Sequence, residues 1–279
     1  MTAPTSTGWI ETYRGSVSPW ETDVTEHFTI AFYFDRLDQA EANLMDRIGL
    51  AEAFRRGGFR RRYDLRFARE MRAGAAFHVE AAVTGRDPAL RLGYRFVDSA
   101  NGEVTTWIDA NWDIAAPAGV TLGEWNGPTA EERPVPAGTD GFVPTAAGRV
   151  RPHEIDETGR IGLGALIHKF TDSSLQIGAA VGLTADFIKT GRRGFSTFEL
   201  ALEISRAPGS GEPFANQTGL LHLGGSSLRF LHVMRNAATG EELARLGQYG
   251  VQLDLDKRRP APLNDEMRAR AQKLVVPMG

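Results

Sequence analysis

The sequence predicts an α+β fold built from two tandem copies of one unit, each with a long helix packed on an antiparallel β-sheet. The first observation behind this prediction is an internal repeat: GSVSPWETD at 15–23 matches GRVRPHEID at 148–156, displaced by 133 residues. LRLGYRFVDSANGE at 90–103 resembles LRFLHVMRNAATGE at 228–241, displaced by 138 residues. The second observation is that apolar residues recur at helical spacing after each acidic loop. The third is that strand-like alternation follows each of these helical segments. Two anchors in the same order favour duplication over chance similarity.

The repeat also sets the expected domain boundaries. Residues 1–115 form the first unit and residues 148–279 the second. The segment between them, 116–147, is rich in proline and glycine and has little periodicity, so it is expected to be a connector that lies partly across the second unit. The difference between the two displacements indicates a small loop insertion, which we place at 207–213.

Each unit shows the same order of elements. A short strand, Tyr13–Val17 or Arg149–Arg151, leads through a proline into an acidic loop. Apolar residues then recur at helical spacing over 30–50 and 163–183. Alternating strands follow, as in FHVEAAV at 77–83, with a glycine-containing turn that is typical of a hairpin.

Composition excludes several classes of protein. The chain has 279 residues, 42% hydrophobic and 24% charged, as expected for a folded soluble protein. It has no cysteine, which removes disulfides, thiolate metal sites and a cysteine nucleophile. No histidine or carboxylate spacing suggests a metal site. A net charge of -3 gives no reason to expect nucleic acid. Without a basic, apolar leader or a membrane-length apolar run, we expect a cytoplasmic protein with no membrane partner.

The first acidic loop and helix carry a resemblance to a known family. WETDVTEHFTIAFYFDRLDQAE resembles the opening of the hotdog-fold thioesterases of the 4-hydroxybenzoyl-CoA type, in which an acidic loop D-x-D-x-x-G-H-x-N precedes a helix with tyrosine and an acidic–alanine pair. The matching residues are Glu21, Asp23, His27, Tyr33, Asp38 and Ala40. Two copies resemble the double-hotdog arrangement, in which one chain supplies what is normally a homodimer.

The resemblance implies an acyl-CoA thioesterase that needs no cofactor, coenzyme A being part of the substrate. The chain would act as a monomeric pseudo-dimer or as a homo-oligomer. Departures from the pattern keep two alternatives open: a non-catalytic acyl-thioester-binding protein and an enoyl-CoA hydratase-like hotdog enzyme. Thr25 and Thr29 stand where the related plant-type acyl-carrier-protein thioesterases have asparagine, and the second copy has Arg160 in place of His27.

The first loop is therefore the better catalytic candidate. Thioester hydrolysis needs a nucleophile or base and donors for the developing oxyanion. A carboxylate beside a helix N-terminus can meet the first need, and the free N–H groups of that helix can meet the second. We assign Asp23 as base or nucleophile, His27 as its proton-transferring partner and Glu21 as the alternative carboxylate. The competing interpretation is that Asp23 and Thr25 cap the helix.

Substrate contacts are expected on both sides of the thioester. Thr25 lies in the catalytic loop, and Tyr33 would line an acyl channel along the helix–helix seam. An arginine cluster around a Gly–Gly turn at 54–67 and its counterpart at 188–195 suit the phosphates of coenzyme A. The arginines proposed for this role are Arg61, Arg62, Arg192 and Arg193. The alternative is that they are solvated surface residues.

Overall fold

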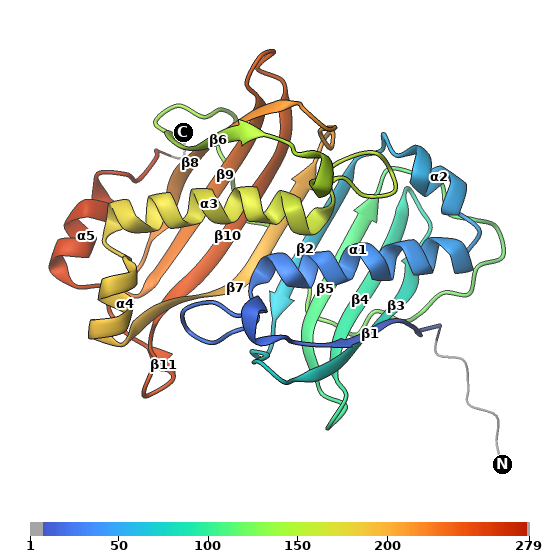
Figure 1. Cartoon of the computed structure of the whole chain (residues 1–279), viewed down its shortest axis with the longest axis horizontal. Coiled ribbons are helices and arrows are strands. Elements are labelled where there is room, and N and C mark those ends of the chain that lie inside the picture. Colours follow the sequence, from blue (N-terminus) through green and yellow to red (C-terminus); the bar gives the residue numbers. More distant parts are fainter. Residues whose placement is uncertain (1–7, 278–279) are drawn as a thin grey trace.

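The computed structural model describes residues 8–277, so part of the N-terminal stretch considered above lies outside the described residues. It contains one 11-stranded sheet in the order β1-β3-β4-β5-β2-β7-β10-β9-β8-β6, with β11 paired to β10. Two long helices run antiparallel on one face of this sheet (Figure 1). The predicted α+β architecture of two helix-on-sheet units is confirmed.

The elements repeat in the two halves of the chain. The first unit contains β1 (Ile10–Ser16), a 3-10 turn η1 (Pro19–Glu21), α1 (Ile30–Arg47), α2 (Ala51–Arg56), β2 (Arg61–Phe67), β3 (Ala76–Gly85), β4 (Leu90–Asp98) and β5 (Val104–Trp112). The second contains β6 (Val143–Arg149), η2 (Pro152–Glu154), α3 (Leu163–Val181), α4 (Ala185–Gly191), β7 (Arg193–Ile204), β8 (Pro213–Leu223), β9 (Ser227–Asn236), β10 (Glu242–Asp254), β11 (Arg259–Pro260) and α5 (Asp265–Gln272).

The predicted helices match α1 and α3, because apolar side chains at helical spacing face the sheet and are buried there. The opening strands begin earlier than the sequence suggests. β6 spans Val143–Arg149 because it pairs along this length with β8, a contact that local sequence does not show. The expected strand Arg149–Arg151 is therefore only the end of β6. No helix within residues 8–277 is both long and apolar enough to cross a membrane.

The two units share one continuous sheet. β2 of the first unit pairs antiparallel with β7 of the second, from Arg61 opposite Ile204 to Arg66 opposite Glu199. The connector crosses the sheet face opposite the helices. Gly123 N–H donates to Val83 O in the first unit (2.8 Å), and Pro134 O accepts from Arg229 in the second. The connector thus spans both units.

The helices approach most closely where α3 begins. A methyl group added at Gly164 would lie 2.8 Å from Asp35 Cβ and 3.1 Å from Ala31 O of α1. Only a residue without a side chain allows this separation. The start of α3 is therefore held against the N-terminal part of α1.

We expect Gly164→Ala to lower the free energy of unfolding by about 1–3 kcal/mol, because the added methyl forces the helices apart. Gly178→Ala on the same helix is the control, since its methyl would lie at an ordinary 3.7 Å from Leu183 Cβ. That change should be neutral or stabilise by up to about 1 kcal/mol, through helix propensity. Urea unfolding measures both. Equal effects of the two changes would contradict the close crossing.

Candidate functional site

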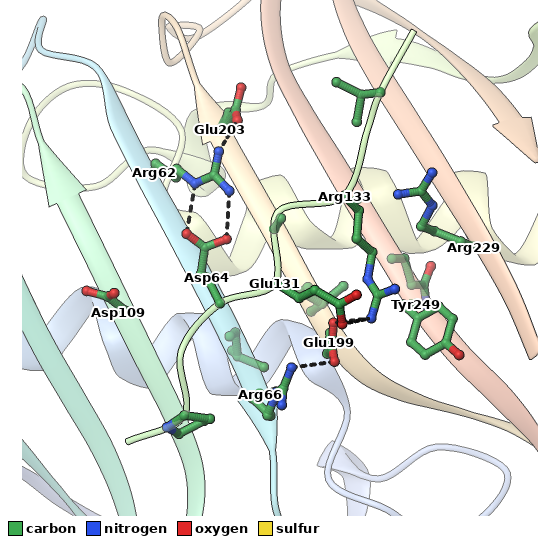
Figure 2. A pocket seen from close by; sticks show the side chains of 18 of the residues that line it. Arg62, Asp64, Arg66, Asp109, Glu131, Arg133, Glu199, Glu203, Arg229 and Tyr249 are labelled. Atoms are coloured by element: carbon green, nitrogen blue, oxygen red, sulfur yellow. Dashed lines mark hydrogen bonds and ion pairs between the residues drawn. The ribbon is translucent and has the colours of Figure 1, made fainter. Parts of the chain in front are cut away.

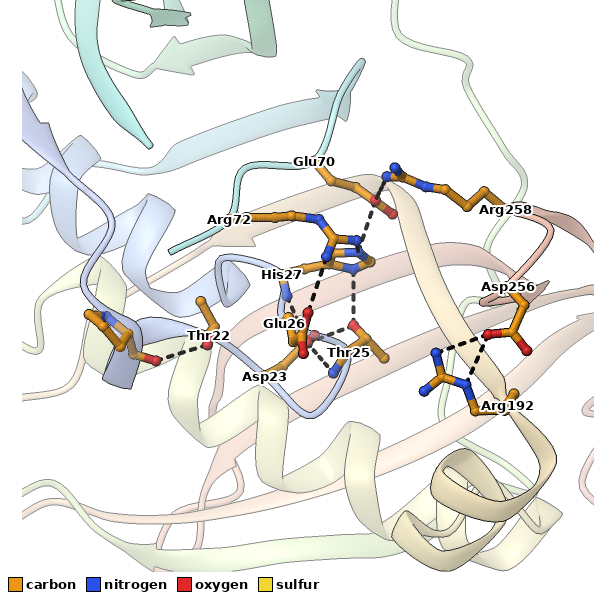
Figure 3. Close-up of polar contacts among 11 residues, drawn as sticks. Thr22, Asp23, Thr25, Glu26, His27, Glu70, Arg72, Arg192, Asp256 and Arg258 are labelled. Atoms are coloured by element: carbon orange, nitrogen blue, oxygen red, sulfur yellow. Dashed lines mark hydrogen bonds and ion pairs between the residues drawn. The ribbon is translucent and has the colours of Figure 1, made fainter. Parts of the chain in front are cut away.

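The two acidic loops fold into the same turn. Asp23 Oδ1 accepts from the Thr25 backbone N–H (2.7 Å) and hydroxyl (2.6 Å), as Figure 3 shows. Asp156 Oδ1 accepts from the same two groups of Thr158, at 2.8 and 2.5 Å. These carboxylates stabilise a turn within the loop. They do not cap α1, whose N-cap is Thr29, so the capping interpretation is corrected in its location.

Glu21 is a buried structural carboxylate. Its Oε2 accepts from the Ser18 backbone N–H (2.7 Å), and its Oε1 forms an ion pair with Arg36 of α1. Glu154 repeats this arrangement in the second unit, with Lys169 as the cation. Both oxygens of Glu21 are engaged in holding η1 to α1. The expectation that Glu21 is an alternative catalytic carboxylate stays a prediction, and Glu21→Gln tests it.

His27 has a partner that the sequence analysis missed. Its Nε2 lies 2.9 Å from Glu70 Oε2, and its Nδ1 lies 2.9 Å from Thr25 Oγ1 (Figure 3). Hydrogen bonds from His27 and from Arg258 (3.0 Å) lower the pKa of Glu70. Asp23 meets only the backbone N–H of His27, at 3.2 Å. The ring therefore pairs with Glu70, and Asp23 and His27 do not form the expected side-chain pair.

Tyr33 belongs to the hydrophobic core. Its side chain is buried, with the residue only 2% exposed. Its ring packs against Phe28, Phe67 and Phe96, with centroids 4.6, 5.1 and 5.2 Å away. The expectation that Tyr33 lines an acyl channel along the helix seam is corrected, because the ring points into the sheet beneath α1.

The four candidate arginines do not form one phosphate site. Successive residues of a strand point to opposite faces, so Arg61 is buried beneath α1 while Arg62 lies on the outer face, bonded to Asp64 (2.8 Å). Arg192 and Arg193 lie at the start of β7, paired at 3.0 Å with Asp256 and Asp254. All four guanidinium groups already face carboxylates.

A carboxylate of the first unit lies at the N-terminus of the second long helix. Asp38 Oδ2, from α1, accepts from the backbone N–H of Leu163 (2.6 Å) and lies 3.4 Å from that of Gly164. The preceding Gly162 makes room, since a methyl there would lie 3.0 Å from Asp38 Oδ2. The first N–H groups of a helix lack partners within the helix and carry its positive end, which favours an anion. The two units thus build this contact together.

Asp38 belongs to a group of buried polar side chains that also contains Glu41, Arg61 and Tyr63. We call this group the buried carboxylate cluster. Glu41 is 0% exposed, accepts from the Tyr63 hydroxyl (3.2 Å) and lies 3.8 Å from Arg61. Among the described residues, Asp38 Oδ1 and Glu41 Oε1 have no hydrogen-bond partner. Burial raises the pKa of Asp38 and of Glu41 well above the usual range, and the Arg61 charge opposes this. Two buried carboxyl groups have a single ion pair between them, Glu41 with Arg61, so the cluster retains a proton more readily than exposed carboxyls do.

An open pocket of about 470 Å³ lies between α2, the α2–β2 turn and the residues that follow β5 and β7. Residues of the α2–β2 turn, including the exposed Arg56 and Arg60, form one wall, and Asp113 and Ser205 lie opposite. Gly57 of the same turn faces Thr158, since a methyl at Gly57 would lie 3.8 Å from Thr158 Cβ. Two solvated guanidinium groups therefore lie in a pocket next to the loop that contains Thr158 and precedes α3. Both belong to the arginine cluster seen in the sequence, although neither was among its four proposed ligands.

No family model matches the chain, and no curated protein matches its sequence. Solved structures match nearly its whole length. A candidate oleoyl thioesterase from Lactobacillus plantarum has a TM-score of 0.66 at 13% identity, covering 90% of this chain and 99% of its own. An acyl-ACP thioesterase from Bacteroides thetaiotaomicron VPI-5482 has a TM-score of 0.65 at 12% identity, covering 88% and 98%. The 12:0-ACP thioesterase from Umbellularia californica has a TM-score of 0.61 at 14% identity, covering 88% and 94%.

At these identities the likeness shows the fold alone. The chain has the tandem hotdog fold of these thioesterases, and the resemblance carried by the first loop is confirmed at the level of the fold.

Glu41→Gln should stabilise the protein at pH 8, by about 1–3 kcal/mol, because it removes a carboxylate whose pKa folding raises. A raised pKa favours the folded state below the pKa of the unfolded chain and disfavours it as pH rises through the folded value. The gain over the unmodified protein should therefore shrink as pH falls toward 5. Thermal unfolding from pH 5 to 8 measures this.

Glu212→Gln supplies the opposite case. Hydrogen bonds from Arg206 lower the pKa of Glu212 to about 2, so this carboxylate stabilises the fold above the pKa of the unfolded chain. Its replacement should destabilise at pH 8, and less so as pH falls. If Glu41→Gln behaved like Glu212→Gln, the buried carboxylate cluster would be a net stabilising ion pair, contrary to our interpretation.

Proposed function

We propose that this protein hydrolyses acyl thioesters at the N-terminus of α3. One observation carries the proposal: Asp38, a desolvated carboxylate of the first unit, lies against the free N–H groups that open the helix of the second unit. A base next to preorganised oxyanion donors is the pair that acyl transfer to water requires. The shared fold of named thioesterases supports the same reaction class by analogy.

The chemistry follows from these contacts. The thioester carbonyl oxygen replaces Asp38 Oδ2 on the N–H groups of Leu163 and Gly164, which then stabilise the negative charge that develops on it. The released Asp38 carboxylate takes a proton from a water molecule as that water attacks the thioester carbon. Collapse of the tetrahedral intermediate breaks the C–S bond, and protonated Asp38 gives the proton to the leaving sulfur, which regenerates the carboxylate. The products are a free acid and a thiol. Glu41 and Arg61 act as positioning residues for Asp38.

We propose acyl-CoA as the substrate, with coenzyme A entering as part of it and no further cofactor. Arg56 and Arg60 at the mouth of the pocket suit the phosphates of the thiol arm. The solved structures with the same fold include acyl-ACP thioesterases, so carrier-protein substrates form a second arm of the experiment.

The pair His27–Glu70 is the competing catalytic location, at the other end of the helix seam. A histidine held 2.9 Å from a carboxylate can act as a general base, as the first-loop hypothesis requires. In that location the matching position on the facing helix is Thr171, whose hydroxyl donates to Ile167 O. Thr171 offers no carboxylate at the position that Asp38 occupies on α1, and for this reason we favour the N-terminus of α3.

Asp38→Asn should reduce thiol release from acyl-CoA by about 100-fold or more, since the amide cannot accept the proton of the attacking water. In the unmodified protein, kcat/KM should fall as pH falls through the raised pKa of Asp38, above the usual carboxyl range. Thiol release over a panel of acyl chain lengths, from pH 5 to 9, measures both.

The matched controls are Glu21→Gln, Asp23→Asn and His27→Gln. If Asp38→Asn retains activity while His27→Gln loses it, the active site lies in the first loop. If the unmodified protein binds acyl-CoA but releases no thiol at any chain length, it is a binding protein. If it hydrates enoyl-CoA without releasing thiol, it is a hydratase. Each of these results overturns the proposal.

Replacing both Arg56 and Arg60 with glutamine should raise KM for acyl-CoA about tenfold and leave KM for short thioester analogues without phosphate unchanged. Arg55→Gln is the control, because Arg55 is also exposed on α2 but lies 3.4 Å from Asp46 and outside the pocket. Acyl-ACP tested in parallel shows which carrier the arginines serve. Equal losses on both kinds of substrate would contradict a phosphate role.

A further inference from the structure

The connector encloses a cavity on the sheet face that α1 and α3 do not cover. Residues 128–135 pass over strands β2, β7, β10 and β9 and leave a space of about 150 Å³ beneath them (Figure 2). Arg62 and Arg66 line this space, whereas Arg61, the residue before Arg62, faces α1. The space is therefore separated by the sheet from the N-terminus of α3. We call it the connector pocket.

Ion pairs fix most of the charged groups in this pocket. Glu199 of β7 accepts from Arg66 of β2 (2.5 Å) and from Arg133 of the connector (3.2 Å). Arg62 donates to Glu203 at 2.7 Å. Figure 2 shows Arg133 extending from the connector to Glu199. These contacts hold the connector to both units and neutralise each of the cations concerned.

Arg229 of β9 is the exception. Of the cations lining the pocket within residues 8–277, it alone has no carboxylate partner. Its Nη2 donates to Pro134 O (2.8 Å), and its buried Nε has no acceptor among the described residues. Arg133 Nε is likewise buried without an acceptor. Loss of water and the charge of Arg133 both lower the pKa of Arg229. The charge of Glu131 on the connector acts on that pKa in the opposite sense. This end of the pocket therefore has one guanidinium without an ion-pair partner and two unused donors.

The remaining walls are apolar and aromatic. Trp107, Trp125, Tyr249, Leu231 and Val135 all line the pocket. A space with apolar and aromatic walls and few unsatisfied polar groups is typical of a small-molecule site. One unpaired guanidinium matches one negative charge, and the walls match a short hydrocarbon or aromatic body. Buried donors without acceptors in a native protein call for an unseen partner.

We propose that the connector pocket binds a small organic carboxylate, whose carboxylate group pairs with Arg229 and whose apolar body lies against Tyr249 of β10 and Leu231 of β9, on the strands next to and containing Arg229. The assignment is independent of the thioester reaction, because the sheet separates the two sites. It makes the connector part of a binding site as well as a link between units.

Benzoate is the first probe, with butyrate and inorganic phosphate in parallel, each titrated up to 10 mM into the full chain. Isothermal titration calorimetry should show saturable benzoate binding with a stoichiometry of one. Arg229→Gln should weaken it at least tenfold. Arg235→Gln, on the same strand but outside the pocket and paired with Glu242, should leave it unchanged.

Gly247→Val tests the same pocket without changing a charge, and it serves if Arg229→Gln does not fold. Gly247 lines the cavity, and a methyl there would make only an ordinary 3.7 Å contact with Ala201 Cβ. The larger side chain should fill the space and also weaken benzoate binding at least tenfold. Three results overturn the proposal: no binding of any probe, binding unchanged in Arg229→Gln and Gly247→Val, or binding of phosphate without either carboxylate.

Discussion

The hydrogen bond from the Leu163 N–H to Asp38 Oδ2 joins residues 125 positions apart and ties the two units together at their helices. It requires that α3 begin against the side of α1, which Gly162 and Gly164 permit by having no side chains. The positive end of α3 then favours a carboxylate at this point. Helix packing and assembly of the candidate site are therefore one constraint. A change that separates the helices also removes the base from its donors.

The duplication keeps the supports of this arrangement and varies the rest. Glu21 forms an ion pair with Arg36 of α1, and Glu154 forms one with Lys169 of α3. Each ion pair fixes a 3-10 turn to the long helix that follows it. The turns held by the two loop aspartates also repeat. What repeats in both copies is thus structural. The sequence pattern named Glu21 as an alternative to Asp23, and the structure places Glu21 in the contact that holds η1 to α1.

Periodicity and repetition were enough to predict the fold, because both long helices bury a regular apolar stripe and both units follow it with alternating strands. The sequence also predicted the Gly–Gly turn, in which Gly57 and Gly58 adopt positive φ values of 58° and 83°. The residues of the candidate site were harder to predict from the sequence. The arginine cluster looked like one basic patch, yet strand alternation places Arg61 and Arg62 on opposite faces. The contact of Asp38 with α3 depends on how two distant helices cross, which no local pattern encodes.

The side chains buried beneath α1 differ chemically from those buried beneath α3. This difference favours the N-terminus of α3, where Asp38 of α1 lies, as the reactive end of the helix seam. Beneath α3, at the position that matches Glu41, Ser174 bonds to His232 and Gln248 (3.2 and 2.8 Å). Burial lowers the pKa of His232 to about 4, so this network is neutral at pH 7. Beneath α1, by contrast, the carboxyl groups of Asp38 and Glu41 lie out of water and only Glu41 forms an ion pair, with Arg61 at 3.8 Å. This arrangement costs free energy relative to neutral partners. The second copy shows that the fold does not need that charge. A costly charged cluster retained at only one of two equivalent positions is a mark of function rather than of folding.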